Sequence, residues 1–187
     1  MILAARDIHF SYHGQSVLAG ANLALGTSEL VCLLGSNGAG KSTLLRIMLG
    51  LLRPGQGSVS LDGRPLAGQD RRQLAQRVAY VPQVHVATFP YTVLRVALMG
   101  RLPATGIVRA PGAADLARVH RALEQLGIAH LADRVYTEVS GGERQLTLIA
   151  RAMAQEARLL VMDEPLAGLD YGNQLRLLDR LERLAAD

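Results

Sequence analysis

The sequence has few of the residues that mark a secreted, membrane-spanning or nucleic-acid-binding chain. It contains no tryptophan and one cysteine among 187 residues, so no disulfide can form within the chain. Aromatic residues make up only 4%, with no cluster that could stack single-stranded bases. No apolar run reaches the roughly 18 residues that cross a bilayer, and the start, "ILAARDIHF", lacks the features of a signal peptide. We therefore expect a cytoplasmic globular protein whose membrane role, if any, comes through a partner.

The positive charge does not indicate a nucleic-acid partner. The formal net charge is +4, but the basic residues are spread along the chain. The densest cluster, "DRRQLAQR" at residues 70–77, is explained as well by a solvated surface or by contact with acidic membrane lipids. We expect no nucleic acid to bind.

Apolar segments alternate between strand-like and helix-like patterns, which is typical of an α/β domain. "ILAARDIHFSY" and "SVLAGANLALG" predict two paired strands with a turn at Gly14-Gln15, and thus an antiparallel β edge near the N-terminus. The continuous apolar runs "ELVCLL", "RVAYVPQ" and "RLLVMDEP" predict buried strands of a mostly parallel sheet. Cys32, within the first run, is expected to be a buried structural thiol. Helices are predicted for "GKSTLLRIMLGLL", "ERQLTLIARAMAQ" and residues 173–186.

The stretch from residue 91 to 133 has a different composition. It is rich in Ala, Leu and Arg, with helical spacing in "YTVLRVALMG" and "ADLARVHRALEQLG" on either side of the turn-rich "LPATGIVRAPG". We interpret residues 91–133 as a helical subdomain inserted into an α/β core of residues 1–90 and 134–187. Residues 1–187 would then form a single domain.

The segment "LGSNGAGKST" places glycines, a lysine and two hydroxyls where a predicted strand meets a predicted helix. It fits the phosphate-binding pattern G-x-x-x-x-G-K-[ST] from Gly35 to Ser42. Glycines let successive backbone N–H groups face one anion, and the helix N-terminus adds positive potential. Lys41, the only lysine of the chain, would reach the β- and γ-phosphates, and Ser42 would hold Mg²⁺. A plain glycine-rich turn is the alternative.

Two carboxylates follow the apolar strand predicted in "LLVMDE". Asp163 is placed to hold Mg²⁺ directly or through water, and Glu164 to act as general base toward the water that attacks the γ-phosphate. The alternative is a strand that merely ends in two acidic residues. Beside a phosphate loop, the pair indicates a P-loop nucleotide hydrolase.

The segment "VSGGERQ" at residues 139–145, upstream of "LLVMDEP" and "LAGLD", resembles the signature sequence of ABC transporter ATPases. The resemblance runs over essentially all 187 residues in the expected order. It implies ATP and Mg²⁺ as ligands and a head-to-tail homodimer, in which residues 140–142 of one subunit cover ATP on the phosphate loop of the other. It also implies that Gln83 senses Mg²⁺ and water and that Tyr12 stacks on adenine. Tyr12 could equally be a core or surface tyrosine, and Gln83 could simply end a strand.

The expected site has three sets of residues. The catalytic residues are Glu164 and Gln83, and the metal ligands are Ser42, Gln83 and Asp163. The nucleotide-binding residues are Tyr12, Gly35, Ser36, Asn37, Gly38, Ala39, Gly40, Lys41, Ser42, Thr43, Ser140, Gly141, Gly142, Glu143 and Asp170.

The sequence departs from the family pattern in several places. Ser36 stands where proline is common, Val139 where leucine precedes the signature serine, and Leu166-Ala167 where small hydroxyl residues are frequent. The family also places a switch histidine beyond the Walker B carboxylates, and no histidine follows Glu164 here. On this basis we expect a C-terminally shortened member that binds ATP with weak or absent turnover.

The segments "FPYTV", "YTEVSGGE" and "LDYGNQ" resemble importer subunits for iron–siderophore, haem or cobalamin uptake. Such subunits bind a separate membrane permease at the cytoplasmic face of the plasma or inner membrane, and a periplasmic or surface substrate-binding protein serves the permease. Residues 85–95 are expected to receive the permease's coupling helix. A metal or molybdate importer ATPase is the near alternative, and a soluble ABC ATPase of DNA repair or translation is the distant one.

Overall fold

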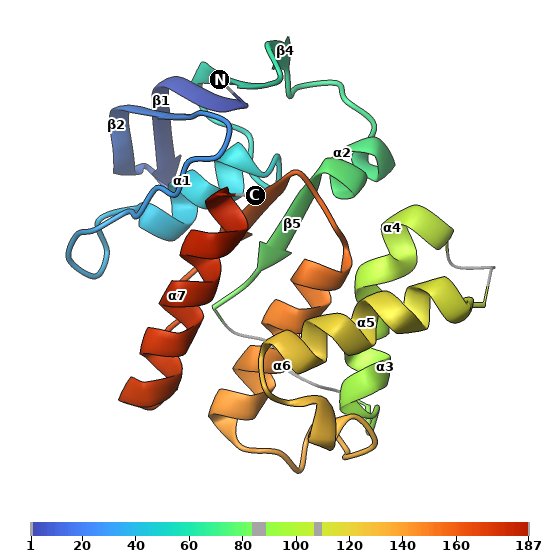
Figure 1. Ribbon diagram of the computed structural model, residues 1–187. Coiled ribbons are helices and arrows are strands. Elements are labelled where there is room, and N and C mark those ends of the chain that lie inside the picture. Colours follow the sequence, from blue (N-terminus) through green and yellow to red (C-terminus); the bar gives the residue numbers. More distant parts are fainter. Residues whose placement is uncertain (1, 84–88, 107–109, 187) are drawn as a thin grey trace. The chain divides into compact units, whose positions relative to one another are not determined.

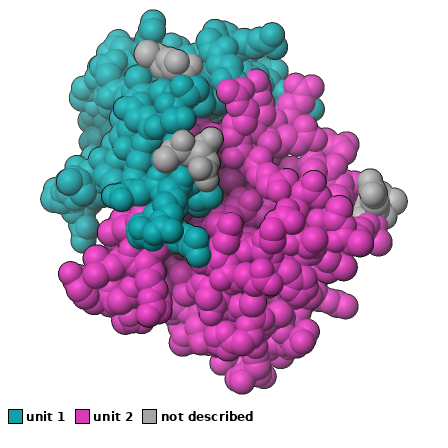
Figure 2. Space-filling view, viewed as in Figure 1, with its two compact units in different colours: residues 1–70, 179–187 teal, residues 71–178 magenta. Residues whose placement is uncertain are grey.

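The computed structural model describes residues 2–83, 89–106 and 110–186, and its chain divides into two compact units (Figure 2). Unit 1 comprises residues 1–70 and 179–187, and unit 2 comprises residues 71–178. Among the described helices, none combines the length and the hydropathy that a membrane span requires.

Unit 1 contains a four-stranded antiparallel sheet in the order β2-β1-β3-β4 (Figure 1). β1 and β2 form a hairpin in which His13 and Gly14 both have positive φ, 47° and 84°. The turn lies one residue earlier than predicted because Gln15 already pairs with Tyr12. The antiparallel β edge is confirmed. The elements of unit 1 are β1 Leu3–Tyr12, β2 Gln15–Leu25, α1 Lys41–Met48, β3 Gln56–Leu61 and β4 Arg64–Pro65.

Helix α1 contacts β1 and β2. Its buried residues recur at the spacing of one helical face: Thr43, Leu44, Ile47 and Met48. The helix ends earlier than predicted, because Gly50 adopts a left-handed conformation with φ of 69° and donates its N–H to Ile47 O.

The run "ELVCLL" is not a strand. Residues 29–34 have no regular structure, and the Leu34 side chain is 92% exposed. Cys32 is exposed as well, so the prediction of a buried strand with a buried thiol is wrong. A strand forms only where a neighbouring strand takes up its backbone hydrogen bonds. Among the described strands, none pairs with this run.

Unit 2 combines a parallel strand pair with a layer of helices (Figure 1). β5 and β6 pair from Val78 opposite Leu159 to Val81 opposite Met162, which confirms the strands predicted in "RVAYVPQ" and "RLLVMDEP". The α/β class is confirmed, and the parallel part of the described residues is this pair, because "ELVCLL" forms no strand. The elements are α2 Arg71–Arg77, β5 Val78–Val81, α3 Val93–Leu98, η1 Met99–Arg101, α4 Leu102–Thr105, α5 Ala113–Gln125, η2 Ala129–Leu131, α6 Gly141–Ala154, β6 Leu159–Met162 and α7 Tyr171–Ala186, whose end belongs to unit 1.

Helices α3, α5 and α6 pack on one another. Their shared core consists of apolar residues that are almost wholly buried, among them Val93, Val96, Val119, Leu123 and Ile149. The described residues between 93 and 131 are largely helical, as their spacing predicts. In this structure they belong to the same compact unit as β5, β6 and α6.

Candidate nucleotide site

In unit 1, the phosphate loop of residues 35–40 runs directly into the first turn of α1. Gly38 and Gly40 have φ of 82° and 85°, in the left-handed region that other residues rarely adopt. Gly40 is the N-cap residue of α1. A Cβ added to Gly40 would lie 2.8 Å from Leu18 Cδ2 and 3.1 Å from Val17 O. Both the conformation and the contact with β2 therefore require glycine at residue 40.

Lys41 folds back over the phosphate loop. Its Nζ donates hydrogen bonds to Gly35 O at 2.8 Å and to Ser36 O at 2.9 Å. Gly35 to Ala39 are exposed, so an anion can reach the loop from solvent. Thr43 is buried at 8% exposure, so any contribution it makes to a ligand would come from its backbone N–H.

Tyr12 lies at the end of β1, beside the hairpin turn. Its ring packs edge-on against Phe10, with the ring centroids 4.8 Å apart and the planes at 81°. The side chain is 39% exposed. Phe10 supports one side of the ring and leaves part of it to solvent, which is an arrangement that an adenine base could use.

In unit 2, the parallel strands bring their following residues together at one edge. Gln83 follows β5 and Glu164 follows β6, and Gln83 Nε2 donates to Glu164 Oε2 at 2.6 Å. Asp163 N donates to Val81 O at 3.0 Å, and the Asp163 side chain is buried at 3% exposure. Glu164 is exposed and has a φ of 49°. Backbone strain of this kind clusters at functional sites.

The signature segment forms the N-terminus of α6. Ser140 Oγ accepts from Glu143 N at 3.3 Å, and Glu143 Oε2 accepts from Ser140 N at 2.8 Å, which is a capping box. A hydrogen bond with the Ser140 side chain, followed by the one from Ser140 N, lowers the pKa of the Glu143 carboxyl group below its ordinary 4.5. The Glu143 carboxylate is therefore engaged with Ser140, while the exposed Ser140 and Gly141 present the helix end to solvent.

The segment after Glu164 is tied to the start of α6 and to α7. Gln145 Nε2 donates to Pro165 O at 3.4 Å, and a Cβ on Gly142 would lie 3.4 Å from Gly168 O. Asp170 directly precedes α7, and its Oδ1 accepts from Asn173 N at 2.9 Å and its Oδ2 from Asn173 Nδ2 at 2.7 Å. Hydrogen bonds from Asn173, the backbone one first, lower the pKa of Asp170. Sequence reasoning did not single out Asn173, although a polar residue three positions after a helix-starting Asp is a usable signal.

The two units supply different parts of the chemistry. Unit 1 holds the phosphate loop with Lys41, Ser42 and Tyr12, and unit 2 brings together Gln83, Asp163 and Glu164 and carries residues 140–142 on α6. In the part of the chain that the structure describes, no three His, Cys, Asp or Glu side chains gather into a metal cluster. Mg²⁺ usually takes one or two protein carboxylates and completes its shell with phosphate and water oxygens, and Asp163 is the buried carboxylate at this edge. Residues 84–88, including His85, lie outside the described residues.

Residues 18–167 match the sequence profile of the ABC transporter family. The chain belongs to that family. An uncharacterized ABC transporter ATP-binding protein of Haemophilus influenzae is 43% identical over 184 residues, which are 98% of this chain and 70% of that protein. The hemin import ATP-binding protein HmuV of Nocardia farcinica is 42% identical over 171 residues, 91% of this chain and 57% of HmuV.

Among solved structures, an inward-facing metal-chelate type ABC transporter superposes with a TM-score of 0.83 at 37% identity, over 98% of this chain and 68% of that one. Other relatives, 37% to 40% identical, are named for cobalamin import, molybdate import and manganese and zinc transport. The prediction of an ABC importer ATPase subunit is therefore confirmed, and the relatives include both haem and cobalamin importers and molybdate, manganese and zinc systems. The names of the relatives differ in the transported substrate.

Proposed function

We propose that this chain binds MgATP on its phosphate loop and works as the ATP-hydrolysing subunit of an ABC importer. The observation that carries the proposal is the loop itself. Two left-handed glycines, one pressed against β2, lead into the N-terminus of α1, and the only lysine of the chain lies over the loop carbonyls. This arrangement collects backbone N–H groups, a helix end and one mobile positive charge at a single solvent-accessible place.

On binding, Lys41 Nζ exchanges the carbonyls of Gly35 and Ser36 for the β- and γ-phosphate oxygens. The backbone N–H groups of residues 36–43 hold the phosphates, and Tyr12 offers its exposed ring to the adenine. A lysine suits this place because its ammonium is a compact point charge on a flexible stem, whereas a guanidinium is broad and planar.

Hydrolysis uses the residues after β5 and β6. Mg²⁺, when bound, neutralises phosphate charge and orients the γ-phosphate. Ser42, Asp163 and the amide oxygen of Gln83 would hold it. Glu164 accepts the proton of the attacking water, and the hydrogen bond from Gln83 Nε2 keeps that carboxylate oriented.

A second copy of the chain completes the nucleotide site. Ser140, Gly141 and Gly142 present a hydroxyl and helix-end N–H groups to solvent, which is a second set of donors for phosphate. In a head-to-tail homodimer these donors would cover ATP on the partner's phosphate loop, with Glu143 and Asp170 supporting the contact. ATP would then stabilise the dimer, and hydrolysis would release it.

The partner is a separate membrane permease, which this chain would bind at the cytoplasmic face of the membrane and which a substrate-binding protein would serve. Haem, iron–siderophore or cobalamin compounds are the proposed substrates. Molybdate, manganese or zinc is the second candidate, because relatives named for these transport systems match the chain over nearly its whole length. Exposed Phe89 and Tyr91, whose rings lie 5.8 Å apart, provide apolar surface for a permease helix.

Calorimetry with MgATP tests the nucleotide proposal. We expect binding by the chain, loss of binding in Lys41→Ala, and unchanged affinity in Glu164→Gln with loss of any phosphate release that the reference protein shows. Glu182→Gln, a matched change of an exposed glutamate on α7, should change neither property. Absence of a binding signal in folded reference protein would overturn the proposal. Uptake assays with a permease and each class of substrate would then separate the two candidates for cargo.

A further inference from the structure

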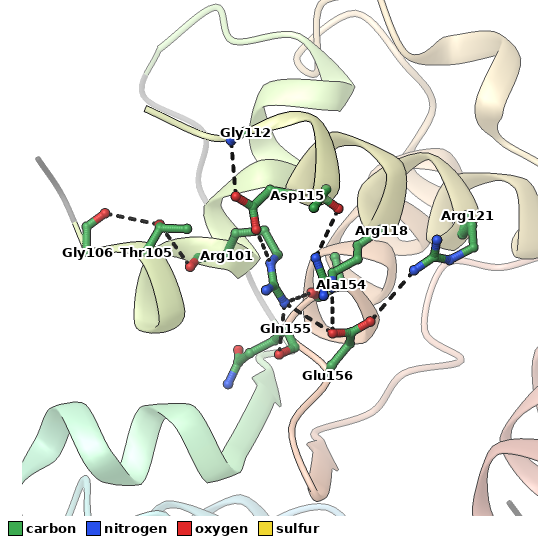
Figure 3. A network of polar contacts seen from close by, with 11 residues as sticks. Arg101, Thr105, Gly106, Gly112, Asp115, Arg118, Arg121, Ala154, Gln155 and Glu156 are labelled. Atoms are coloured by element: carbon green, nitrogen blue, oxygen red, sulfur yellow. Dashed lines mark hydrogen bonds and ion pairs between the residues drawn. The ribbon is translucent and has the colours of Figure 1, made fainter. Parts of the chain in front are cut away.

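A buried polar network joins the helical layer of unit 2 to the C-terminal end of α6 (Figure 3). At its centre is Arg101, which is 7% exposed and lies in η1, next to Asp115 of α5, which is 6% exposed. Arg101 Nε donates to Asp115 Oδ1 at 3.0 Å, and Arg101 Nη1 donates to Ala154 O at 2.7 Å and to Gln155 O at 3.3 Å. One guanidinium thus binds a carboxylate and the last carbonyl groups of α6.

Two acidic residues make further contacts at this junction. Asp115 Oδ2 also accepts from Gly112 N at 3.1 Å and so caps α5. Glu156, just past the end of α6, accepts from Arg118 Nε at 2.8 Å and lies 3.7 Å from Arg101 Nη1. Its φ is 55°, a conformation that favours glycine at this position of a helix end. A glutamate there keeps the backbone strained, and its carboxylate ties α5 to α6.

The residue before Arg101 makes the crossing unusually close. A Cβ on Gly100 would lie 2.0 Å from Arg151 O, so η1 contacts the α6 backbone directly. Gly100 and Arg101 therefore hold the last turn of α6 by a backbone contact and by hydrogen bonds to its carbonyls. The positive charge of the guanidinium also interacts favourably with the negative, C-terminal end of the α6 helix dipole.

The same end of α6 is connected to the strand pair. Gln155 Nε2 donates to Ala75 O and, at 2.9 Å, to Val78 O at the start of β5. β5 leads to Gln83, and α6 begins at Gly141, after its N-cap residue Ser140. The junction at residues 154–156 thus lies at the opposite end of both elements from the residues assigned to the nucleotide.

We propose that Arg101, with Asp115 as its counter-ion, is a positioning residue that anchors the C-terminal end of α6 and thereby sets the position of Ser140–Gly142 at the other end. This inference rests on the proposed function of residues 140–142 in the ATP-bound dimer. α6 has 14 residues and is about 21 Å long at 1.5 Å per residue. A tilt of about 5° at the anchored end moves the other end by roughly 2 Å, and about 1 Å of misplacement can reduce the efficiency of a site 100-fold.

The test replaces the buried pair as a unit, because removal of one partner leaves an unpaired buried charge. The double variant Arg101→Met, Asp115→Leu removes both charges with side chains of similar size. Arg183→Met, Asp179→Leu is the matched control, since it removes an exposed ion pair of α7 in which Arg183 Nη2 lies 3.0 Å from Asp179 Oδ2. Arg101→Lys keeps the buried charge but not the planar fork of donors, and it serves if the double variant does not fold.

All variants are made in the Glu164→Gln background, so that ATP is not consumed. For the buried double variant we expect ATP affinity within about twofold of the reference at protein concentrations where the chain is monomeric, because the phosphate loop belongs to unit 1. The protein concentration for half-maximal ATP-dependent dimerisation, measured by sedimentation, should rise by about 10- to 100-fold. Arg101→Lys should cause a smaller rise, and the control none.

Unchanged dimerisation in the buried double variant overturns the inference, and so does an equal loss of monomeric ATP binding, which would indicate a general structural role. If the reference itself does not dimerise with ATP, the proposed function fails, and hydrogen exchange decides the inference independently. Exchange of the first hydrogen-bonded amides of α6, starting with Arg144 N, which donates to Ser140 O at 2.9 Å, should then be faster by about tenfold or more in the buried variants than in the control. Equal exchange would overturn the inference.

Discussion

Replacement of Gly40 by alanine tests whether β2 holds the phosphate loop in place. The φ of 85° costs an alanine about 1–2 kcal/mol. The new Cβ would also lie 2.8 Å from Leu18 Cδ2 and 3.1 Å from Val17 O, and overpacking of this kind costs about 1–3 kcal/mol. We therefore expect Gly40→Ala to lower the free energy of unfolding by about 2–5 kcal/mol.

Gly38→Ala is the matched control, because it isolates the backbone term. Gly38 has nearly the same φ, 82°, but a Cβ on it would meet no atom within 4 Å. Its substitution should cost only about 1–2 kcal/mol. Both alanines reduce the entropy of the unfolded chain by a similar amount, so this effect cancels in the comparison.

Urea unfolding at 25 °C measures both variants against the reference, with calorimetry of MgATP binding on the same samples. A difference of about 1–3 kcal/mol between the two alanine variants would represent the contact with β2, and Gly40→Ala should also bind ATP more weakly than Gly38→Ala. Equal free energies of unfolding would show that Val17 and Leu18 move aside without cost, and the argument that β2 holds the loop would be wrong.

Three further predictions follow from single side chains. Cys32 is exposed, so a thiol reagent should label it in the native protein about as fast as in urea, whereas strong native protection would support the buried strand instead. Ser140→Ala should raise the pKa of Glu143 toward 4.5 in an NMR titration. Because the folded-state pKa is lowered, the stabilisation from this carboxylate is present above the unfolded-state pKa near 4.5 and is lost as pH falls through the folded-state value. A pKa that stays as low in the variant would show that the Ser140 side chain is not the main cause of the shift. Asp163→Asn should raise the Mg²⁺ concentration needed for ATP binding by about tenfold or more, with ATP affinity in EDTA unchanged, and an unchanged Mg²⁺ titration would remove Asp163 from the proposed metal site.

The features that the sequence predicted well depend on neighbouring residues in the chain. The hairpin turn at His13-Gly14 lies one residue from its predicted place, and α6 begins at Gly141, two residues before the predicted helix, since turns and helix starts depend on side chains and backbone a few positions apart. The contact between Gln83 and Glu164 joins residues 81 apart. The sequence allows this proximity to be predicted, because both residues follow apolar runs that read as parallel strands, and parallel strands end at the same edge of a sheet.

The features that the sequence did not predict depend on partners that no local pattern specifies. "ELVCLL" has the composition of a buried strand, but composition does not state which strand will pair with it. Arg101 is one of 19 arginines among the 20 basic residues of the chain, and its burial depends on an Asp at the start of α5 and on the end of α6. The adjacent Gly100, at the end of an apolar helical run, is the local sequence feature that indicates a close approach between two helices here.

The strand predicted in "ELVCLL" does not form, and yet the phosphate loop that follows it is well formed, because the two depend on different contacts. The ends of helices leave backbone N–H groups without intrahelical partners, so an anion site at a helix N-terminus needs few side chains. In unit 1, the loop conformation is determined after the run "ELVCLL", by Gly40 against β2 and by the first turn of α1. Ser140 at α6 and Asp170 at α7 follow the same logic, each fixed by a capping hydrogen bond with the residue three positions later. Sites built at element ends can therefore be recognised from short motifs even where the element that leads to them is not predicted.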